Sequence, residues 1–235
     1  MKFSIAIPSY EYGGYGASCL EHSFLQMEKQ TYKDFDVVIS DSSVTNEIKR
    51  LCDKWRKKLN IHYYKNKEAI GNPAKNFNNA MKKATGDWIK LLCQDDYFSS
   101  ELSLQKTIEA IDEKHDWLAS GYLHTYDREN FQNYHFPYLN PRIYIINTIG
   151  TPSCVSIKNT SKIMEFDENL SYGFDCEFYY RYFLEYGPPK ILEDITVINY
   201  LWGQSITAKL TNDLLEKENN YVLRKHGFIN NGRDD

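Results

Sequence analysis

The pattern of apolar and polar positions along the first hundred residues predicts strands that alternate with helices. Apolar runs at residues 3–7, 35–40, 61–64 and 88–92 predict short buried strands, the first of which is ended by Pro8. The intervening segments place apolar residues at helical spacing: residues 20–27, 48–59 and 77–84. Such an alternation predicts a mostly parallel sheet with helices on both faces.

The second half of the chain has a less regular pattern. A strand is predicted at residues 117–126, a helix at 174–182, another strand at 191–200 and an amphipathic helix at 208–226. Residues 127–142 combine polar and aromatic residues with proline, which predicts a long loop. The predicted fold class is therefore α/β, with an orderly first half and a smaller, mixed second half.

Composition narrows the classes of function that fit this pattern. The 235 residues are 42% hydrophobic, which suits one domain with a proper core. The net charge of −4 and the lack of a long basic run argue against a nucleic-acid partner. The five cysteines are scattered and predict neither a zinc site nor a disulfide framework. Because no disulfides are indicated, we expect the protein to lie in a reducing cytoplasm. We expect no signal peptide and no membrane-spanning segment, because the apolar runs are too short.

Polar side chains follow three of the predicted strands. Tyr10 follows the first strand, Asp41 the second, and the adjacent pair Asp95 and Asp96 the fourth. In an open α/β sheet, ligands bind at the carboxyl ends of the strands. Two neighbouring carboxylates repel each other, and a divalent cation that also binds a diphosphate is their natural partner. An acidic turn on the surface is the alternative interpretation of the pair.

The glycine-rich segment at residues 13–16 does not carry a known phosphate-binding motif. Cys19 stands where a dinucleotide-binding fingerprint after Gly14 and Gly16 would need its third glycine. A phosphate-binding loop would need Gly-Lys-Ser/Thr, which this segment lacks. We expect a flexible loop beside the site.

An ordered series of short motifs then gives a more specific indication. Each pairs with one predicted element: Pro-Ser-Tyr-Glu at residues 8–11, Gln-Thr-Tyr at 30–32, Asp-Ser-Ser at 41–43, Gly-Asn-Pro-Ala-Lys-Asn at 71–76, Ala-Thr-Gly-Asp-Trp-Ile at 84–89 and Gly-Phe-Asp-Cys-Glu-Phe at 173–178. Over about residues 2–205, the series resembles the inverting glycosyltransferases of family 2, which have the GT-A fold.

The chain also departs from the pattern of that family. The usual Asp-x-Asp-Asp box begins here with Cys93, so its first acid is missing. Lys75 replaces an arginine, which keeps the charge but loses bidentate contact with phosphate. Phe174 stands where the family has a glutamate, and the histidine often found near a closing loop is absent from residues 202–205.

The resemblance implies a Rossmann-like GT-A domain over residues 1–205 and a helical tail over 206–235. Within the domain, residues 1–98 would bind the nucleotide sugar, and residues 99–205 would form the acceptor and catalytic half. The central sheet would be mostly parallel and flanked by helices, with a smaller mixed region on the acceptor side.

The resemblance also assigns roles to individual residues. Asp175 would be the general base that deprotonates the acceptor hydroxyl, although an acid in the first turn of a helix is common for structural reasons. Asp96 would bind Mn²⁺ or Mg²⁺. The nucleotide would be bound by Pro8, Tyr10, Asp41, Lys75, Asn76 and Asp95. Helix capping for Asp41 and packing for Tyr10 are the alternatives.

The aromatic segment between residues 122 and 144 is a candidate acceptor site. Aromatic faces stack on sugars, and loops lie on the surface, so Tyr134 and Tyr138 are candidate acceptor contacts. Glu177, the neighbour of Asp175, is a third candidate. A hydrophobic lid or a contact between subunits explains the same residues. Glu177 lies roughly 200° around a helix from Asp175, so both cannot face one site.

The predicted function is transfer of a sugar from a nucleoside diphosphate, expected to be UDP, with inversion. The acceptor would be a hydroxyl of a glycan or of a lipid-linked saccharide, with peripheral membrane contact and a role in polysaccharide biosynthesis. A sugar nucleotidyltransferase is one alternative, although the arginine that class needs after its glycine loop is missing. An inactive nucleotide-sugar-binding protein is the other. The sequence does not indicate an oligomeric state.

Overall fold

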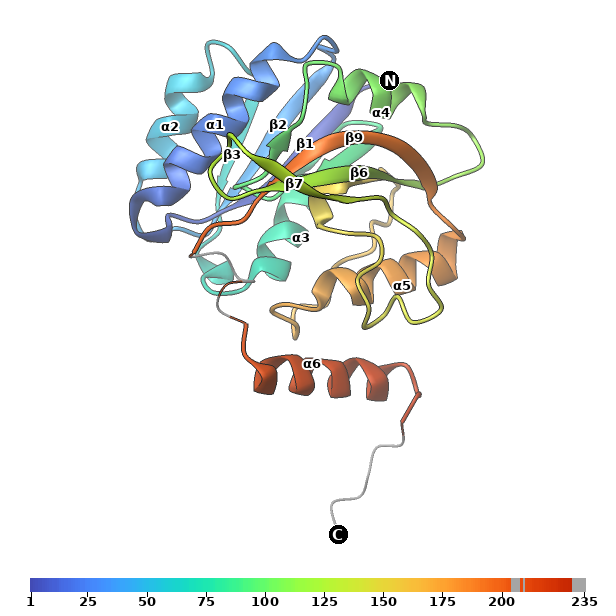
Figure 1. The fold of residues 1–235 in the computed structure, drawn as a ribbon. Coiled ribbons are helices and arrows are strands. Elements are labelled where there is room, and N and C mark those ends of the chain that lie inside the picture. Colours follow the sequence, from blue (N-terminus) through green and yellow to red (C-terminus); the bar gives the residue numbers. More distant parts are fainter. Residues whose placement is uncertain (204–207, 209, 230–235) are drawn as a thin grey trace.

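The computed structural model describes residues 1–203, 208 and 210–229, and within them it forms one mixed sheet of nine strands flanked by helices (Figure 1). The strands are β1 (Phe3–Ser9), β2 (Phe35–Asp41), β3 (Ile61–Lys65), β4 (Trp88–Leu91), β5 (Tyr97–Phe98), β6 (Trp117–Thr125), β7 (Phe131–His135), β8 (Val155–Lys158) and β9 (Lys190–Tyr200). The α-helices are α1 (Tyr15–Lys29), α2 (Glu47–Trp55), α3 (Pro73–Lys83), α4 (Ser103–Glu109), α5 (Phe174–Tyr186) and α6 (Asn212–Lys225).

The sheet has a parallel half and a mixed half. Strands β3, β2, β1 and β4 are parallel neighbours, as the alternation of strands and helices predicts. Beyond β4 the order continues β8, β6, β9 and β5, with β7 paired to β6. In this second half only β6 and β9 are parallel, whereas the other pairs are antiparallel. The predicted fold class, with an orderly half and a mixed half, is confirmed.

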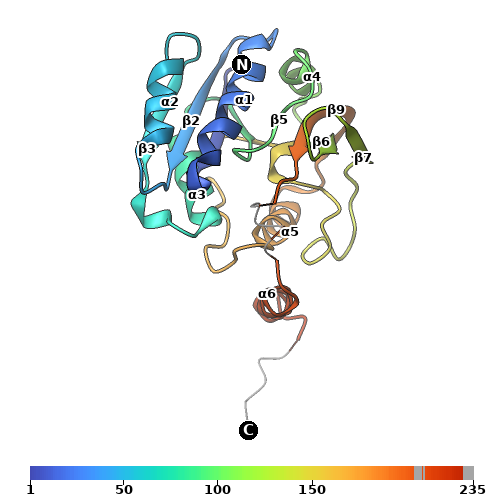
Figure 2. The ribbon, with the colours of Figure 1, turned by 60° about the vertical axis from the view of Figure 1, so that its left-hand side comes forward.

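Helices cover both faces of the parallel half (Figure 2). Ile5 and Ile7 of β1 pack in one cluster with the apolar faces of α1 and α2. Ala6, which points the opposite way, packs in another cluster with α3 and α5. Because successive strand side chains alternate between the faces, β1 has a nearly continuous buried sequence and lies in the middle of the molecule. This core fixes the ends of β1 and β4, where the polar motifs begin.

The start of α3 follows from three adjacent residues. Asn72 is the N-cap, and its side chain accepts a hydrogen bond from the backbone N–H of Lys75 at 2.8 Å. Pro73 follows at the first helical position, where its missing N–H costs nothing. The helix predicted from the apolar spacing at residues 77–84 is confirmed, and its start at Pro73 places Asn76 one turn into the helix beside the end of β1.

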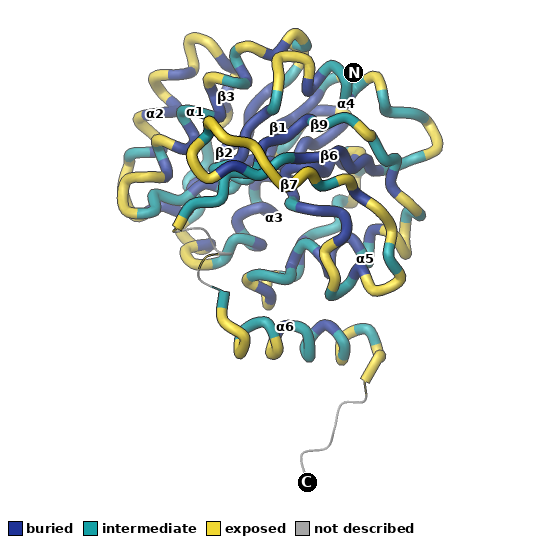
Figure 3. The backbone as a smooth tube through the Cα atoms, viewed as in Figure 1, coloured by how far each residue is buried: buried dark blue, intermediate teal, exposed yellow. Residues whose placement is uncertain are grey.

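The segment over residues 127–142 is not a loop throughout, because it contains β7. This strand lies at the edge of the sheet, and its first four residues are exposed (Figure 3). Because neither of its faces is buried, its sequence does not alternate between apolar and polar residues as a half-buried strand does. Pairing with β6 holds it in place. The short elements α4 and β5 were likewise not predicted, since seven and two residues, respectively, are too few to show a period.

Helix α6 lies at one end of the molecule, beyond α5, in both ribbon views (Figures 1 and 2). Its Glu218 and Val222 are buried, while most of its other side chains are partly or fully exposed. The predicted boundary between domain and tail at residues 205 and 206 lies outside the described residues, as do Gln204 and Ser205 of the segment that lacks a histidine. Within the described part of the chain, no helix is long and apolar enough to cross a membrane.

Candidate active site

A cavity of about 920 Å³ opens where the polar ends of the strands meet. From the first half of the chain, Pro8, Tyr10, Asn76 and Asp95 line it, and from the second half Asp175 lines it. These are five of the residues that the sequence assigned to nucleotide binding and catalysis. The fold thus brings the predicted base and part of the predicted nucleotide site to one cavity.

The β1 end of the cavity is built by backbone contact between α1 and the segment that follows β1. Gln94 connects them: its Oε1 accepts the N–H of Tyr10 at 2.7 Å, and its Nε2 donates to the carbonyl of Gly16 at 2.5 Å. A Cβ on Gly16 would lie 2.0 Å from the carbonyl oxygen of Tyr10, so only glycine fits there. The glycine segment therefore begins a helix packed against the site, with a 3₁₀ turn at Tyr12–Gly14, rather than forming an open loop.

Aromatic rings continue from Tyr10 along this wall. The rings of Tyr10 and Tyr12 meet edge-on with centroids 5.1 Å apart, and Tyr12 meets Trp202 in the same way at 5.4 Å. Such edge-to-face contacts are a favoured geometry for aromatic pairs. Tyr10 therefore has both the packing role that was its alternative interpretation and a place on the cavity surface.

Asp41 is fully buried and does not line the cavity. Its Oδ2 accepts a hydrogen bond from the hydroxyl of Tyr63 at 2.5 Å and forms an ion pair with Lys65 Nζ at 3.0 Å. Its Oδ1 accepts the N–H of Ser43 at 2.8 Å. The next residue, Ser42, does line the cavity. Asp41 thus fixes the turn after β2.

Asn76 is buried and joins the ends of β1 and β2. Its Nδ2 donates to the carbonyl of Ser9 at 3.1 Å and to Ser42 Oγ at 3.3 Å, while its Oδ1 accepts from Ser40 Oγ at 2.6 Å. Lys75, one residue earlier, does not line the cavity, and its ammonium lies 3.7 Å from the carboxylate of the exposed Glu68. Of these neighbours in sequence, only Asn76 faces the site.

The two acids after β4 occupy different positions. Asp95 lines the cavity, and its Oδ2 accepts a hydrogen bond from the indole N–H of Trp202 at 2.8 Å. Asp96 is fully buried and does not line the cavity. Its two oxygens accept four hydrogen bonds, whose donors are Thr151 Oγ1 at 3.2 Å, Ser153 Oγ at 2.5 Å, Asn199 Nδ2 at 2.8 Å and the N–H of Tyr200 at 3.1 Å.

Burial and mutual repulsion set the protonation of this pair. Loss of hydration raises the pKa of Asp96, and the neighbouring charge of Asp95 raises it further. The pKa of Asp95 is raised by burial as well, while the hydrogen bond from Trp202 opposes the shift. Cys93, which stands in place of the first acid, lines the same cavity, and burial raises the pKa of its thiol. The thiol is therefore neutral at physiological pH.

The residues around the two acids offer limited metal ligation. No group of three or more His, Cys, Asp or Glu side chains that could hold a metal ion occurs among the residues the structure describes. Carboxylate oxygens are nevertheless the ligands that Mg²⁺ and Mn²⁺ prefer, and Mg²⁺ commonly uses only one or two of them together with substrate phosphates. Asp95 and Asp96 thus fit a cation held jointly with a diphosphate better than one held by protein alone.

Asp175 stands in the first turn of α5 and faces the cavity. Its Oδ2 accepts a hydrogen bond from Asn147 Nδ2 at 2.8 Å, and its Oδ1 accepts the N–H of Cys176 at 2.7 Å. Loss of hydration outweighs these bonds and raises its pKa to about 6. Such a carboxylate is ionised at neutral pH yet more basic than an exposed aspartate, which suits a general base.

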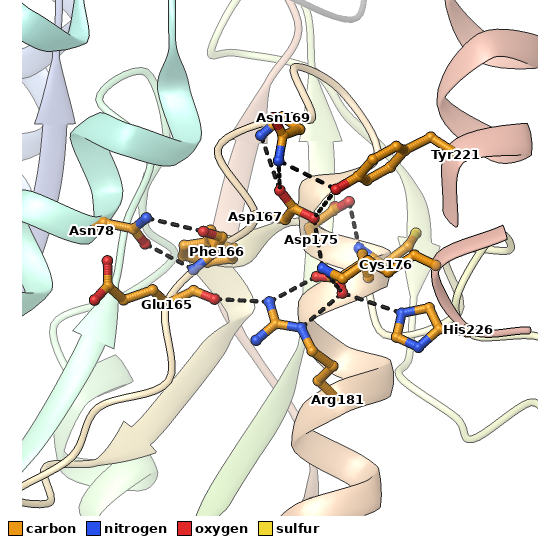
Figure 4. Close-up of polar contacts among 12 residues, drawn as sticks. Asn78, Glu165, Phe166, Asp167, Asn169, Asp175, Cys176, Arg181, Tyr221 and His226 are labelled. Carbon is orange, nitrogen blue, oxygen red and sulfur yellow. Dashed lines mark hydrogen bonds and ion pairs between the residues drawn. The ribbon is translucent and has the colours of Figure 1, made fainter. Parts of the chain in front are cut away.

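Glu177, two residues further along α5, faces away from the cavity. Its carboxylate is fully buried and forms 2.7 Å ion pairs with Arg181 and Lys225, and His226 Nε2 lies 3.2 Å from its Oε1 (Figure 4). Burial opposes ionisation, but the bonds and charges of Arg181 and Lys225 hold the pKa of Glu177 below its ordinary value. The structure thus gives Glu177 a structural ion cluster instead of a place near the acceptor.

The candidate acceptor tyrosines lie outside the cavity. Tyr134 is 70% exposed and Tyr138 is 56% exposed, and neither lines the cavity. His135, between them, does line it, together with Tyr122 and His124 of the neighbouring strand β6. The aromatic segment therefore extends from the mouth of the cavity onto the surface.

Several residues of the site were not predicted from the sequence. They are the partners that hold the predicted residues in place: Tyr63, Lys65, Asn147, Thr151, Asn199 and Trp202. Tyr63, Lys65, Asn199 and Trp202 had an available signal, since all four stand near the end of an apolar strand, where the other site residues were sought.

Comparison with known proteins agrees with this geometry. The sequence profile of glycosyl transferase family 2 matches residues 4–166, well over half of the chain. The poly(ribitol-phosphate) β-N-acetylglucosaminyltransferase TarS of Staphylococcus aureus is 26% identical over 200 residues, covering 83% of this chain and 34% of that protein. The glycosyltransferase GlyG of Streptococcus pneumoniae is 26% identical over 133 residues, which cover 57% of this chain and 42% of GlyG.

Solved structures match the fold as well. The crystal structure of S. aureus TarS 1–349 in complex with UDP-GlcNAc superposes with a TM-score of 0.68 at 23% identity, covering 86% of this chain and 59% of that one. The mannosyltransferase PcManGT of Pyrobaculum calidifontis, in complex with GDP-Man and Mn²⁺, gives 0.60 at 14% identity, with 84% and 56% covered.

The sheet and its flanking helices have the GT-A fold of these solved structures. The chain belongs to glycosyl transferase family 2. It spans about a third of the length of TarS, at 34%.

Proposed function

We propose that this glycosyltransferase transfers a sugar from a UDP-linked donor to an acceptor hydroxyl and inverts the anomeric centre. The single observation that supports this most is that Asp175 and Asp95, which come from the two halves of the chain, line one cavity. Because the related TarS was crystallised in complex with UDP-GlcNAc, N-acetylglucosamine is the sugar we would test first.

In this proposal the base-bearing helix acts on the acceptor and the strand ends bind the donor. Asp175 takes the proton of the acceptor hydroxyl, whose oxygen then bonds to the anomeric carbon. The bond from that carbon to the diphosphate breaks on the opposite side, and UDP leaves with the electron pair. The raised pKa of Asp175, about 6, leaves the side chain ionised at neutral pH and ready to accept the proton.

We further propose that Mn²⁺ or Mg²⁺ assists, held by the carboxylate pair together with the diphosphate. A bound cation would neutralise the charge that develops on the leaving diphosphate. Asp95 faces the cavity, whereas Asp96 would exchange one of its four protein hydrogen bonds for the cation. Asp96 remains the proposed metal ligand, and Pro8, Tyr10 and Asn76 remain the proposed nucleotide contacts.

For the acceptor we propose a saccharide-bearing chain that runs from the cavity along the aromatic segment. His135 at the cavity and the exposed rings of Tyr134 and Tyr138 on either side of it support this path. Rings of this kind stack on the apolar face of a sugar. The TarS name includes a poly(ribitol phosphate), and a glycan or lipid-linked saccharide with free hydroxyls has the same reacting group.

The test is a product assay with a panel of UDP-sugars, with and without Mn²⁺, and with oligosaccharide acceptors. Release of UDP together with a β-linked product from an α-linked donor supports the proposal. Release of pyrophosphate from UTP and a sugar phosphate would indicate a nucleotidyltransferase instead. Tight binding of a UDP-sugar with no product under any condition would indicate a binding protein.

A further inference from the structure

Helix α6 supplies an acidic side chain to the segment just before the base-bearing helix α5. One oxygen of the Glu218 carboxylate accepts the N–H of Ser171 at 2.7 Å, and the other accepts the N–H groups of Tyr172 at 3.0 Å and Gly173 at 2.8 Å. Glu218 is only 6% exposed. Three consecutive backbone donors thus converge on one carboxylate from another helix.

This contact lies at the start of a helix that has no side-chain cap: Glu218 accepts the N–H of the N-cap residue Gly173, and its other two donors, Ser171 and Tyr172, directly precede α5. Gly173 is the N-cap of α5, and having no side chain it makes no side-chain cap hydrogen bond. The first N–H groups of a helix have no partner within it, and an anion placed there is favoured by the helix dipole. Glu218 therefore stabilises the start of α5 from outside, two residues before Asp175.

A second group of contacts holds α6 in this position. Asp167 accepts a hydrogen bond from the hydroxyl of Tyr221 at 2.9 Å (Figure 4). Asp167 also forms an ion pair with Lys225 at 2.5 Å, and Lys225 forms a second ion pair with Glu177. His226 lies against Glu177 as well. These contacts join the second half of α6 to α5 and to the segment before it. None of them involves Glu218, whose carboxylate bonds to residues 171–173.

Helix α6 also forms part of the cavity wall. Leu215, Glu218, Asn219 and Val222 all line the cavity that contains Asp175. Glu218 thus touches both the cavity and the backbone from which Asp175 projects.

We propose that Glu218 is a positioning residue for the transfer reaction. It fixes the backbone of residues 171–173, and through it the orientation of the Asp175 carboxylate toward the acceptor hydroxyl. The inference depends on the proposed role of Asp175 as the base. Its consequence is that α6 completes the active site of the domain.

The first test compares Glu218→Gln with Glu216→Gln. Both remove one negative charge from α6, but Glu216 is exposed, and a glutamine at 218 presents an NH₂ group to backbone donors. We expect kcat to fall roughly ten- to a hundredfold in Glu218→Gln, the effect of a slightly misplaced catalytic group. In Glu218→Gln, the donor KM and the Kd for UDP should stay within about twofold of the wild-type values. In Glu216→Gln, kcat should also stay within about twofold of the wild-type value.

The second test separates positioning from mere docking of the helix. Lys225→Gln weakens the attachment of α6 without touching residues 171–173. The two variants are compared under conditions in which the amides of α6 are equally protected from hydrogen exchange. Under those conditions, the amides of residues 171–173 should exchange faster in Glu218→Gln than in Lys225→Gln. If kcat instead follows α6 protection alike in both variants, the specific role of Glu218 is wrong.

A third variant guards against a folding defect. Glu218→Asp keeps a carboxylate one methylene shorter, and we expect it to recover part of the kcat that Glu218→Gln loses. Full kcat in a folded Glu218→Gln, with transfer lost in Asp175→Asn, would overturn the role of Glu218 alone. Wild-type protein that releases no UDP from any donor would overturn both this inference and the proposed function.

Discussion

At the scale of single residues, the site depends on carboxylates held in contrasting environments. Asp175 lines the cavity and has a raised pKa, whereas Glu177, two residues away, is enclosed by Arg181, Lys225 and His226. Asp95 and Asp96 differ in the same way, one facing the cavity and the other enclosed by donors. We therefore expect acid–base chemistry of Asp175, which lines the cavity, and not of Glu177, whose oxygens are held in ion pairs.

The first prediction concerns the base. Asp175→Asn should lower kcat at least about a hundredfold, the scale of general-base catalysis, while the Kd for UDP stays unchanged. Because the pKa of Asp175 is raised to about 6, the protonated and inactive form predominates below that pH. The wild-type kcat should therefore fall about tenfold per pH unit below about 6, instead of holding down to the pKa of an ordinary aspartate, about 4. Full activity in Asp175→Asn, with loss in Glu177→Gln, would move the base to Glu177.

The second prediction separates the two acids after β4. Asp95→Asn should weaken Mn²⁺-dependent binding of UDP with little change in stability, since Asp95 accepts one side-chain hydrogen bond, from Trp202. Asp96→Asn should also lower the free energy of unfolding by about 1–3 kcal/mol, because a buried acceptor of four hydrogen bonds is altered. Calorimetry with UDP, with and without Mn²⁺, and thermal unfolding measure the two effects. Unchanged metal-dependent affinity in both variants would contradict the proposed metal site.

At the scale of elements, the sequence predicted best the alternating strands and helices of the first half, and worst the strand at the edge of the sheet. The strands and helices of residues 3–92 were predicted because each buries one apolar face or a whole apolar run. Strand β7 was missed because its pairing with β6 depends on backbone hydrogen bonds that leave no pattern in the side chains. The partner of Asp175, Asn147, was missed because only tertiary contact brings the two side chains together.

The third prediction belongs to the aromatic segment around β7. The double change Tyr134→Ala and Tyr138→Ala removes two exposed rings, so the melting temperature should hardly move. If the acceptor runs along this segment, its KM should rise several-fold while the donor KM stays constant. Steady-state kinetics with acceptors of increasing length provide the test. A change of oligomeric state at full activity would show that the rings form a contact between subunits.

At the scale of the whole molecule, one cavity joins the end of the parallel half, where we propose that the donor binds, to helix α5, which carries the proposed base Asp175. The clusters that pack against α1 and α3 lie on opposite faces of the sheet and fix its strand ends before any ligand arrives. The motifs identified both halves because most of them stand where a predicted strand or helix begins or ends. Only the structure shows that α6, which follows α5 and β9 in the chain, returns through Glu218 to the cavity that contains Asp175.

The fourth prediction tests this preformed arrangement. A ligand that binds only the folded protein adds about 2.7 kcal/mol to the free energy of unfolding at about a hundredfold excess over its Kd. UDP should therefore raise the melting temperature, and Gly16→Ala should reduce that gain, because a methyl group at residue 16 would push α1 away from Tyr10. Differential scanning fluorimetry with UDP and with GDP measures the effect. Equal shifts for the two nucleotides would contradict the expected preference for uridine.

The neutral thiol of Cys93 has a consequence for how the donor is bound. Where the family pattern places three acids after this strand, the present chain places two, so the rim of its cavity repels an incoming diphosphate less strongly. A bound cation would therefore have less negative charge to neutralise at the rim, and binding of UDP would depend less on it. We therefore expect this enzyme to retain more affinity for UDP in the presence of a chelator than a variant in which Cys93→Asp restores the third charge.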